Sequence, residues 1–268
     1  MIEPKYAAVM EEYINIGAFC DAKSLKPQKE EVIALTRAYK ALYARAYDCI
    51  AAAGSVSREL SSHLVDADVI AAVKKRTQGI ISREIGKKSG ERGREKRRFL
   101  TALSAQGYVN YFDTAETLAK RVYHLDNNLG LAHYMLEDIA KAATADGYDC
   151  ILCPSPLNPE RLEHLFIPSL SLAFISSNYQ AQYQGPFYRH VRLDAMAEGE
   201  RLKSHKAKIR FSKKIFHLLI GEALSALADA KSIHDELEAI YNPHMDFPAL
   251  YDLAEHHLSA LLEKAKPA

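Results

Sequence analysis

The chain contains an internal repeat. Residues 13–60 align with residues 190–237 at a constant offset of 177 residues and without a gap. The identical pairs are Ala18/Ala195, Leu25/Leu202, Lys26/Lys203, Lys29/Lys206, Leu42/Leu219, Ala46/Ala223, Ala51/Ala228, Ala53/Ala230, Ser55/Ser232, Glu59/Glu236 and Leu60/Leu237. The alignment keeps one register through both a turn and a helical pattern. This favours duplication over the explanation that two Ala-rich helices are alike by chance. The repeat predicts that both copies fold alike, with one complete unit, roughly residues 97–268, preceded by only the tail of another.

Both ends of the chain are predicted to be helical. Apolar residues recur at spacings of three and four from residue 29 to residue 64, with Gly54 as the one point where such a helix could break. A shorter helix is predicted over residues 67–85, with Asp66 as its N-cap. The same pattern returns near the end of the chain, where it predicts helices over residues 209–240 and 248–264.

The middle of the chain alternates between two kinds of pattern. Short apolar runs typical of strands lie at residues 108–112, 121–125, 150–153 and 171–175, and helical stretches separate them, the clearest at residues 130–143. Such alternation is typical of an α/β layer. The predicted fold class is therefore α/β, with a small, mainly parallel sheet flanked by long helices at both ends.

Positive charge is concentrated before this core. Residues 74–98 contain eleven basic and three acidic residues, a net charge of +8 in a chain whose total is +1. Glycines divide the end of this segment, which favours a flexible connection. We therefore predict a helical domain at residues 1–88, a basic linker at residues 89–98, and an α/β core with a helical tail at residues 99–268.

The basic segment also has the charge that a nucleic acid or another polyanion would need in a binding partner. The candidate contact residues are Lys87, Lys88, Arg92, Arg94, Lys96, Arg97 and Arg98. No apolar run is long enough for a membrane span, and charges occupy the N-terminal positions where a signal peptide needs an apolar core. The sequence therefore predicts a cytoplasmic protein without membrane contact.

Four segments carry a resemblance to a known family. They are EPKYAAVMEEYINIGAFCD, FLTALSAQGYVNYFDTAETLAKRVYHL, GYDCILCPSPLNPERLEHLFIPSLSLAFISSN and AKSIHDELEAIYNPHMDF. The chain resembles an uncharacterised bacterial family of tandem P-loop ATPases, whose members have two nucleotide-binding units, each with a helical tail. The resemblance covers nearly the whole chain, and it implies a P-loop NTPase-like core in the second unit, from about residue 98.

The chain departs from the family at the loop after RVYHL, where relatives have a GxPGTGKST-type sequence. Asp126 stands at the first motif glycine, Leu131 at the glycine before the lysine, Ala132 at the lysine, and His133 at the magnesium-binding Ser or Thr. Gly130 is the one glycine of this loop. The lysine would neutralise phosphate charge and the hydroxyl would hold the metal, so their loss predicts a degenerate loop. Asn158 likewise stands where relatives tend to have Asp.

Other candidate sites have plainer explanations. Cys150 and Cys153 form a C-x-x-C, but within a strand their side chains point to opposite faces, which favours buried structural thiols. The groups His234-Asp235-Glu236 and Glu255-His256-His257 lack the i, i+4 spacing of a helical histidine pair. The aromatic residues of the segment SSNYQAQYQGPFYRHV could stack on bases, although packing against the core is favoured.

These observations together predict a non-catalytic P-loop NTPase-like protein. It would act through binding, as the partner of an intact ATPase subunit, or paired with a second copy of itself. No cofactor is expected, neither ATP nor Mg²⁺, and no metal site. Two alternatives stay open: binding of a nucleic acid or polyanion by residues 74–98, and the residual ATPase or nucleotide kinase activity that the family resemblance alone implies.

Overall fold

The structure, a computed structural model, describes residues 13–86, 91–197 and 203–264. The chain divides into two compact units, one of them Leu42–Ala228 and the other made of the residues before and after it. These boundaries fall inside the two longest helices, α2 (Lys29–Leu64) and α7 (Lys206–Tyr241). The long helices therefore contribute residues to both units.

The two copies of the repeat form helices of equal length. Helices α2 (Lys29–Leu64) and α7 (Lys206–Tyr241) have 36 residues each, and the offset of 177 residues relates both of their ends. Each is followed by an 18-residue helix, α3 (Ala67–Glu84) and α8 (Phe247–Lys264). The prediction that both copies fold alike is confirmed for these helices. Among the described residues, no helix combines the length and apolar character that crossing a membrane requires.

Gly54 does not interrupt α2. It is buried, and a Cβ at this position would lie 3.2 Å from the carbonyl oxygen of Leu157. The glycine therefore allows close approach of the helix to a neighbouring loop. The predicted N-cap of α3 is confirmed, because the Asp66 carboxylate accepts a hydrogen bond from the Val69 N–H at 2.9 Å.

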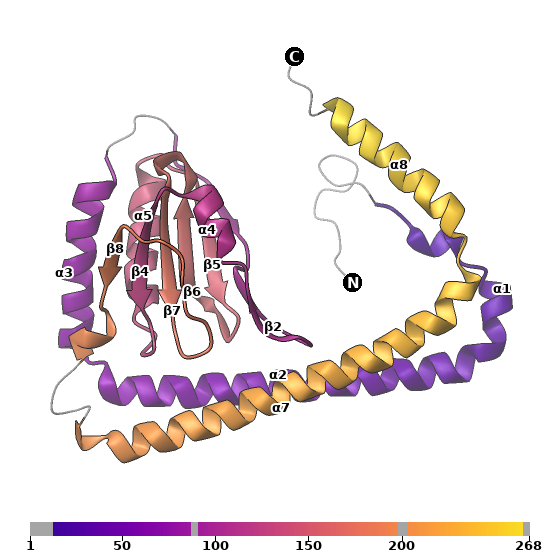
Figure 1. The fold of residues 1–268 in the computed structure, drawn as a ribbon, viewed down its shortest axis with the longest axis horizontal. Helices are drawn as coiled ribbons and strands as arrows, with labels where there is room; N and C mark the ends of the chain where they lie inside the picture. The colour runs from indigo at the N-terminus through magenta and orange to yellow at the C-terminus, as the bar shows by residue number, and fades with distance from the viewer. Residues whose placement is uncertain (1–12, 87–90, 198–202, 265–268) are drawn as a thin grey trace. The chain divides into compact units, whose positions relative to one another are not determined.

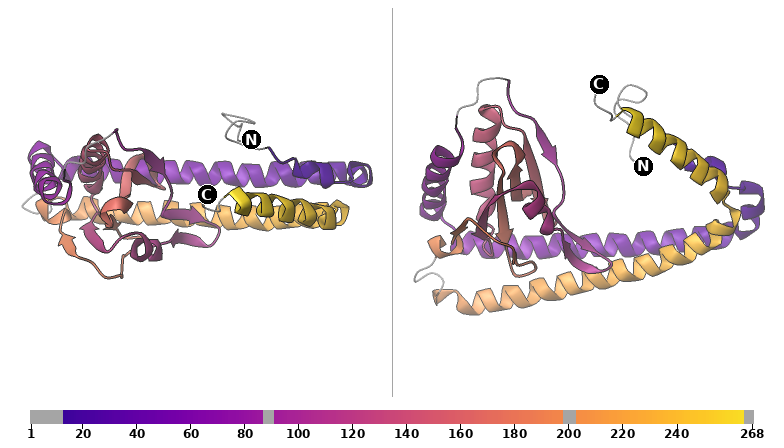
Figure 2. Two further views of the ribbon diagram at one scale, coloured as in Figure 1. Left: turned by 90° about the horizontal axis from the view of Figure 1, so that it is seen from above. Right: turned by 45° about the horizontal axis from the view of Figure 1, so that its top comes forward.

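Within the unit Leu42–Ala228, α2 and α7 pack side by side and antiparallel (Figures 1 and 2). Arg45 pairs with Glu222 at 2.6 Å, and Lys208 pairs with Glu59 at 2.6 Å. Ala46 is buried in the same small cluster as Ala223, its own counterpart in the repeat. The two helices thus cross at equivalent residues, as they would around a local pseudo-two-fold axis.

A six-stranded sheet forms the core of the same unit, in the order β1-β5-β6-β7-β4-β8. Its strands are β1 (Glu95–Arg97), β4 (Arg121–Asp126), β5 (Cys150–Ser155), β6 (Asn158–Ile167), β7 (Leu172–Ser177) and β8 (Arg189–Val191). Strand β6 is antiparallel to both of its neighbours, and the remaining pairs are parallel. The prediction of an α/β fold with a mainly parallel sheet and long flanking helices is confirmed.

Helices cover both faces of this sheet (Figure 1). On one face α5 (Ala132–Ala145) and α3 share a large core with the apolar side chains of β4, β5 and β7. On the other face α4 (Asp113–Leu118) lies over a second, smaller core. Cys150 belongs to the first core and Cys153 to the second, so their side chains do point to opposite faces.

The structure contains four strands that the sequence analysis did not predict, β1, β2, β6 and β8, and it places one predicted strand in a separate sheet. Residues 95–97, expected within a basic linker, form edge strand β1, whose charged side chains are all exposed and give no apolar signal. Strand β6 was not predicted, because it is buried only from Leu162 onward and contains Pro159. The strand expected at residues 108–112 is β3 (Gly107–Asn110), which pairs with β2 (Thr101–Ser104) in a separate two-stranded sheet.

Candidate functional site

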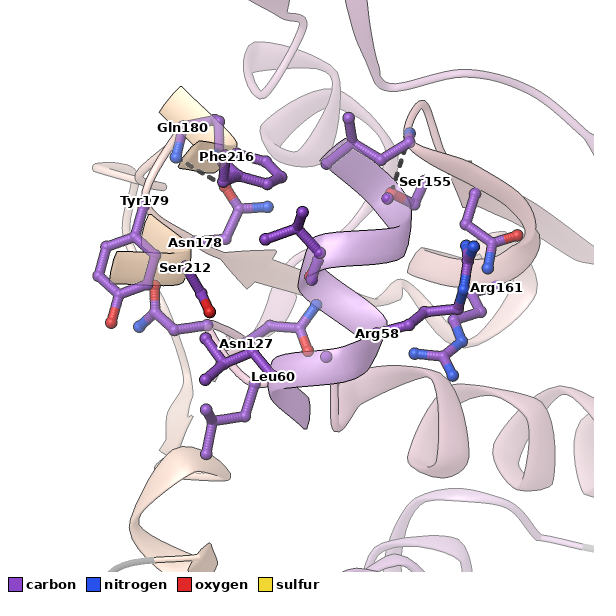
Figure 3. Close-up of a pocket in the computed structure, with 18 of the residues that line it drawn as sticks. Arg58, Leu60, Asn127, Ser155, Arg161, Asn178, Tyr179, Gln180, Ser212 and Phe216 are labelled. Carbon is purple, nitrogen blue, oxygen red and sulfur yellow. Dashed lines mark hydrogen bonds between the residues drawn. The ribbon is translucent and has the colours of Figure 1, made fainter. Parts of the chain in front are cut away.

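A pocket of about 360 Å³ lies in the unit Leu42–Ala228, at the edge of the sheet where its parallel strands end (Figure 3). Asn127 follows β4, Ser155 ends β5 and Asn178 follows β7, and all three line it. Residues of α2 and α7 close the pocket from the outside. In open α/β sheets, ligands bind at this carboxyl edge of the parallel strands. The pocket is therefore the candidate functional site.

The loop between β4 and α5 forms one wall of the pocket, in the strand–loop–helix order that the sequence predicts. Gly130 has a φ of +71°, a left-handed conformation that favours glycine. The Asp194 carboxylate accepts hydrogen bonds from the N–H groups of Asn128 at 2.9 Å and Leu129 at 3.0 Å. The Asn127 side-chain oxygen accepts another from the Ala132 N–H at 2.9 Å. Three backbone N–H groups of this loop are thus held by side chains of the protein itself.

Asp194 places a negative charge at this loop. Burial raises the pKa of its carboxyl group, and the charge of Asp126 acts in the same direction, whereas the hydrogen bonds from Asn128 and Leu129 oppose them. A polyphosphate entering the loop would meet this carboxylate where it needs positive charge and donors. The arrangement therefore disfavours phosphate binding at the loop.

The predicted loop residues do not form a phosphate site. Asp126 ends β4, and its carboxylate lies 2.6 Å from Nε2 of His190. Ala132 is buried at the first position of α5 and offers no charge. Nδ1 of His133 donates a hydrogen bond to the Gly130 carbonyl at 3.0 Å, and burial, followed by the charge of Arg161, lowers the pKa of His133. This histidine is therefore mostly neutral at neutral pH.

Two arginines that the sequence analysis did not single out face the pocket (Figure 3). Arg161, half-buried on β6, places Nη1 3.6 Å from the position that a Cβ of Gly130 would take. Arg58 of α2 donates a hydrogen bond to Ser55 at 2.8 Å. Within the described residues neither guanidinium forms an ion pair with a carboxylate. This end of the pocket thus offers positive charge to an anionic group.

Glu163 contributes a buried acid to the same pocket. Its carboxyl group accepts hydrogen bonds from Thr101 at 3.0 Å and from the Asn178 amide at 2.6 Å, and burial raises its pKa to about 7. A carboxyl group with such a pKa can hold or release a proton near neutral pH. Neighbouring His164 stays neutral, because burial lowers its pKa to about 3.

The aromatic segment after β7 divides between core and surface. Tyr183 is buried in the smaller core, whereas Tyr179, Phe187 and Tyr188 stay about half exposed. The Lys213 ammonium group lies 3.8 Å from the centre of the Tyr179 ring, which lines the pocket. The sequence analysis favours packing of all these aromatic residues against the core. In the structure, only part of the segment packs in this way.

Some of the residues proposed for polyanion binding form ion pairs or hydrogen bonds within the protein. Arg94 pairs with Asp149 at 3.3 Å, and Arg92 lies 3.9 Å from Glu95. Arg97 and Arg98 donate hydrogen bonds to the carbonyl groups of Pro159 and Arg97, and Lys96 is exposed on β1. Lys87 and Lys88 lie outside the described residues. Charged side chains on an edge strand such as β1 also prevent pairing with a second sheet.

Burial makes Cys150 and Cys153 unreactive, and this can be measured. Burial raises the pKa of both thiols to about 12, whereas Cys20 and Cys49 are partly exposed. We expect Ellman's reagent to modify two thiols of the native protein quickly and the other two at least about a hundredfold more slowly, because the thiolate is the reacting form. In denaturant all four should react at one rate. Four fast thiols in the native protein would contradict the burial.

No protein-family model matches the chain, and comparisons with curated proteins and with solved structures find no match either. The resemblance to tandem P-loop ATPases accordingly stays a prediction from the segments quoted above.

Proposed function

We propose that the protein is a non-catalytic relative of P-loop ATPases that acts by binding instead of hydrolysing a nucleotide. The observation that carries this proposal is the occupation of the loop after β4 by the protein's own side chains. Asp194 takes the N–H groups of Asn128 and Leu129, and Asn127 takes that of Ala132. The loop also has no lysine to neutralise phosphate charge and no Ser or Thr to hold magnesium.

The pocket beside the loop keeps features suited to binding. Arg58 and Arg161 offer positive charge at one end, and Tyr179 and Phe216 offer aromatic surface at the other (Figure 3). Such a pocket suits a ligand with an anionic group, whether a small molecule or an acidic segment of a partner such as an intact ATPase subunit. Binding would then involve the arginines of the pocket and leave the backbone of the loop occupied.

Titration calorimetry with MgATP tests the non-catalytic part of the proposal. We expect no binding to the full chain tighter than about millimolar, a free energy near −4 kcal/mol, and no release of phosphate. The reason is that the loop has no lysine to neutralise phosphate charge, and that Asp194 and Asn127 hold three of its backbone N–H groups. Micromolar affinity together with phosphate release would instead support the alternative of residual ATPase activity.

Replacing Asp194 tests whether its carboxylate closes the loop. Asp194→Ala frees two backbone donors and removes a negative charge, so inorganic phosphate should bind at least about tenfold more tightly than to the unmodified chain. Hydrolysis of ATP should still be absent, because no lysine or metal-binding hydroxyl is restored. Asp138→Ala is the matched control, since it removes a carboxylate from α5 without touching the loop. Equal phosphate affinity of both variants would show that Asp194 does not close the site.

A further inference from the structure

Three potential metal ligands meet at the end of β4. His124 and Asp126 lie on β4, and His190 lies on the neighbouring parallel strand β8, directly opposite His124 in the register. One ligand atom from each side chain lies within 4.8 Å of the other two. Asp126 Oδ1 lies 2.6 Å from His190 Nε2. The cluster depends on strand order, because 64 residues separate Asp126 from His190.

The geometry of the sheet explains why the three side chains converge. Residues two apart on a strand point to the same face, and register partners on adjacent parallel strands lie side by side. His124 and Asp126 therefore share a face, and His190 stands beside His124, with the two imidazole rings stacked at 4.8 Å. The face is the one that carries the smaller core, because Val122 on the same side of β4 belongs to that core.

The surroundings of the cluster favour a cation. Among the described residues, Asp126 pairs with no lysine or arginine that would compete for its carboxylate. Ser177 offers a hydroxyl oxygen 2.7 Å from Nε2 of His124. The Phe187 ring lies 5.5 Å from the His124 ring and 5.9 Å from the His190 ring, so it packs beside both imidazoles.

We propose that His124, Asp126 and His190 bind a divalent first-row transition-metal ion such as Zn²⁺. Two imidazoles and one carboxylate suit this class of ion, whereas Mg²⁺ prefers oxygen ligands alone. Ligand atoms about 2.1 Å from a tetrahedral ion are about 3.4 Å apart. One pair of these atoms is 2.6 Å apart and all of them lie within 4.8 Å of one another, so small side-chain rotations bring the ligands into place. Three protein ligands leave a coordination position for water or another small ligand.

Calorimetric titration of the chelator-treated full chain with ZnCl₂ tests the site. We expect one high-affinity Zn²⁺ ion per chain, with a dissociation constant of about micromolar or tighter, and no comparable heat from MgCl₂. Asp126→Asn and His190→Ala should each weaken Zn²⁺ binding at least about tenfold. Binding of Co²⁺ should give a visible absorption band that both variants lose, which reports on the ligands directly.

A second cluster provides the matched control. Ligand atoms of His234, Asp235 and Glu238 on α7 also lie within 4.8 Å of one another. His234→Ala removes that cluster and should leave the high-affinity ion in place. Two results would overturn the proposal. One is that His234→Ala loses Zn²⁺ binding while Asp126→Asn keeps it. The other is that the unmodified chain binds Zn²⁺ no more tightly than about 100 µM. Circular dichroism checks that each variant folds. If His190→Ala does not fold, Zn²⁺ binding by Asp126→Asn, whose side chain nearly keeps its shape, decides the test.

Discussion

Replacing Arg121 by Met is expected to lower the free energy of unfolding by about 1 to 3 kcal/mol. Arg121 forms an ion pair with the carboxylate of Glu84, whose side chain is only 1% exposed. The same carboxylate accepts hydrogen bonds from the Tyr123 hydroxyl at 2.5 Å and from Arg83 Nε at 3.0 Å. Without Arg121 the buried charge keeps only part of its compensation, and a buried charge that loses a partner is strongly destabilising.

The same network predicts how stability depends on pH. Burial alone would raise the pKa of Glu84, but the hydrogen bonds from Tyr123 and Arg83 and the charge of Arg121 outweigh it and hold the pKa below the ordinary value of 4.5. A depressed folded-state pKa means that the stabilisation is fully present above about pH 4.5 and is lost as the pH falls through the folded-state value. The Arg121→Met variant should lose less stability than the unmodified chain over that acidic range.

Denaturant unfolding of the full chain, followed by circular dichroism, measures the change. Lys120→Met is the matched control, because Lys120 precedes Arg121 but is exposed, and it should change the free energy of unfolding by no more than about 0.5 kcal/mol. The double variant Glu84→Gln/Arg121→Met should be more stable than the sum of the single effects predicts. If Arg121→Met and Lys120→Met were equally stable, the network would not stabilise the fold.

A second large effect is expected where α2 and α7 cross. Ala46→Asp and Ala223→Asp should each lower the free energy of unfolding by about 3 kcal/mol or more, because each puts an unpaired carboxylate into a fully buried position. The two losses should be similar, since the residues are equivalent in the repeat and pack within one cluster. Denaturant unfolding of the two variants in parallel makes the comparison.

Exposed alanines on the same helices serve as controls. Ala44→Asp on α2 and Ala228→Asp on α7 introduce the same side chain at solvent-facing positions and should cost at most about 1 kcal/mol, which is the loss of helix propensity. A large loss at Ala46 with none at Ala223 would contradict a crossing at equivalent residues. Losses at the exposed positions as large as at the buried ones would show that helix propensity, and not burial, decides the effect.

The sequence predicts best those elements whose apolar residues form a clear pattern along the chain. The long pattern over residues 29–64 matches α2 at both ends, and the offset of 177 residues transfers those bounds to α7. Strand β4 is also predicted within one residue, since it is a buried strand of a parallel sheet and reads as a short apolar run. Strand β1 gives no such signal, because the exposed triplet Glu95–Arg97 is held in the sheet only by backbone pairing with β5.

The candidate site could be predicted only in part, because it is assembled from distant segments. The sequence predicts the loop after β4, but Asp194, whose carboxylate accepts hydrogen bonds from the Asn128 and Leu129 N–H groups, follows Asn128 by 66 residues and carries no recognisable motif. Arg161 lies on the unpredicted strand β6, and Arg58 lies on a helix that was assigned to another domain. The pairing of His124 with His190 requires the order of strands in the sheet, which spacing along the chain does not determine.

The crossing of α2 and α7 has an evolutionary consequence. Near a local two-fold axis each residue packs on its own duplicate, so a change in one copy immediately meets the other copy. A larger side chain at Ala46 would crowd the small buried cluster that also contains Ala223, and the reverse is equally true. The two copies of the repeat are therefore not independent at this point. In chains that descend from the same duplication, we expect covariation between the positions of Ala46 and Ala223, while the outer faces of the two helices diverge without such coupling.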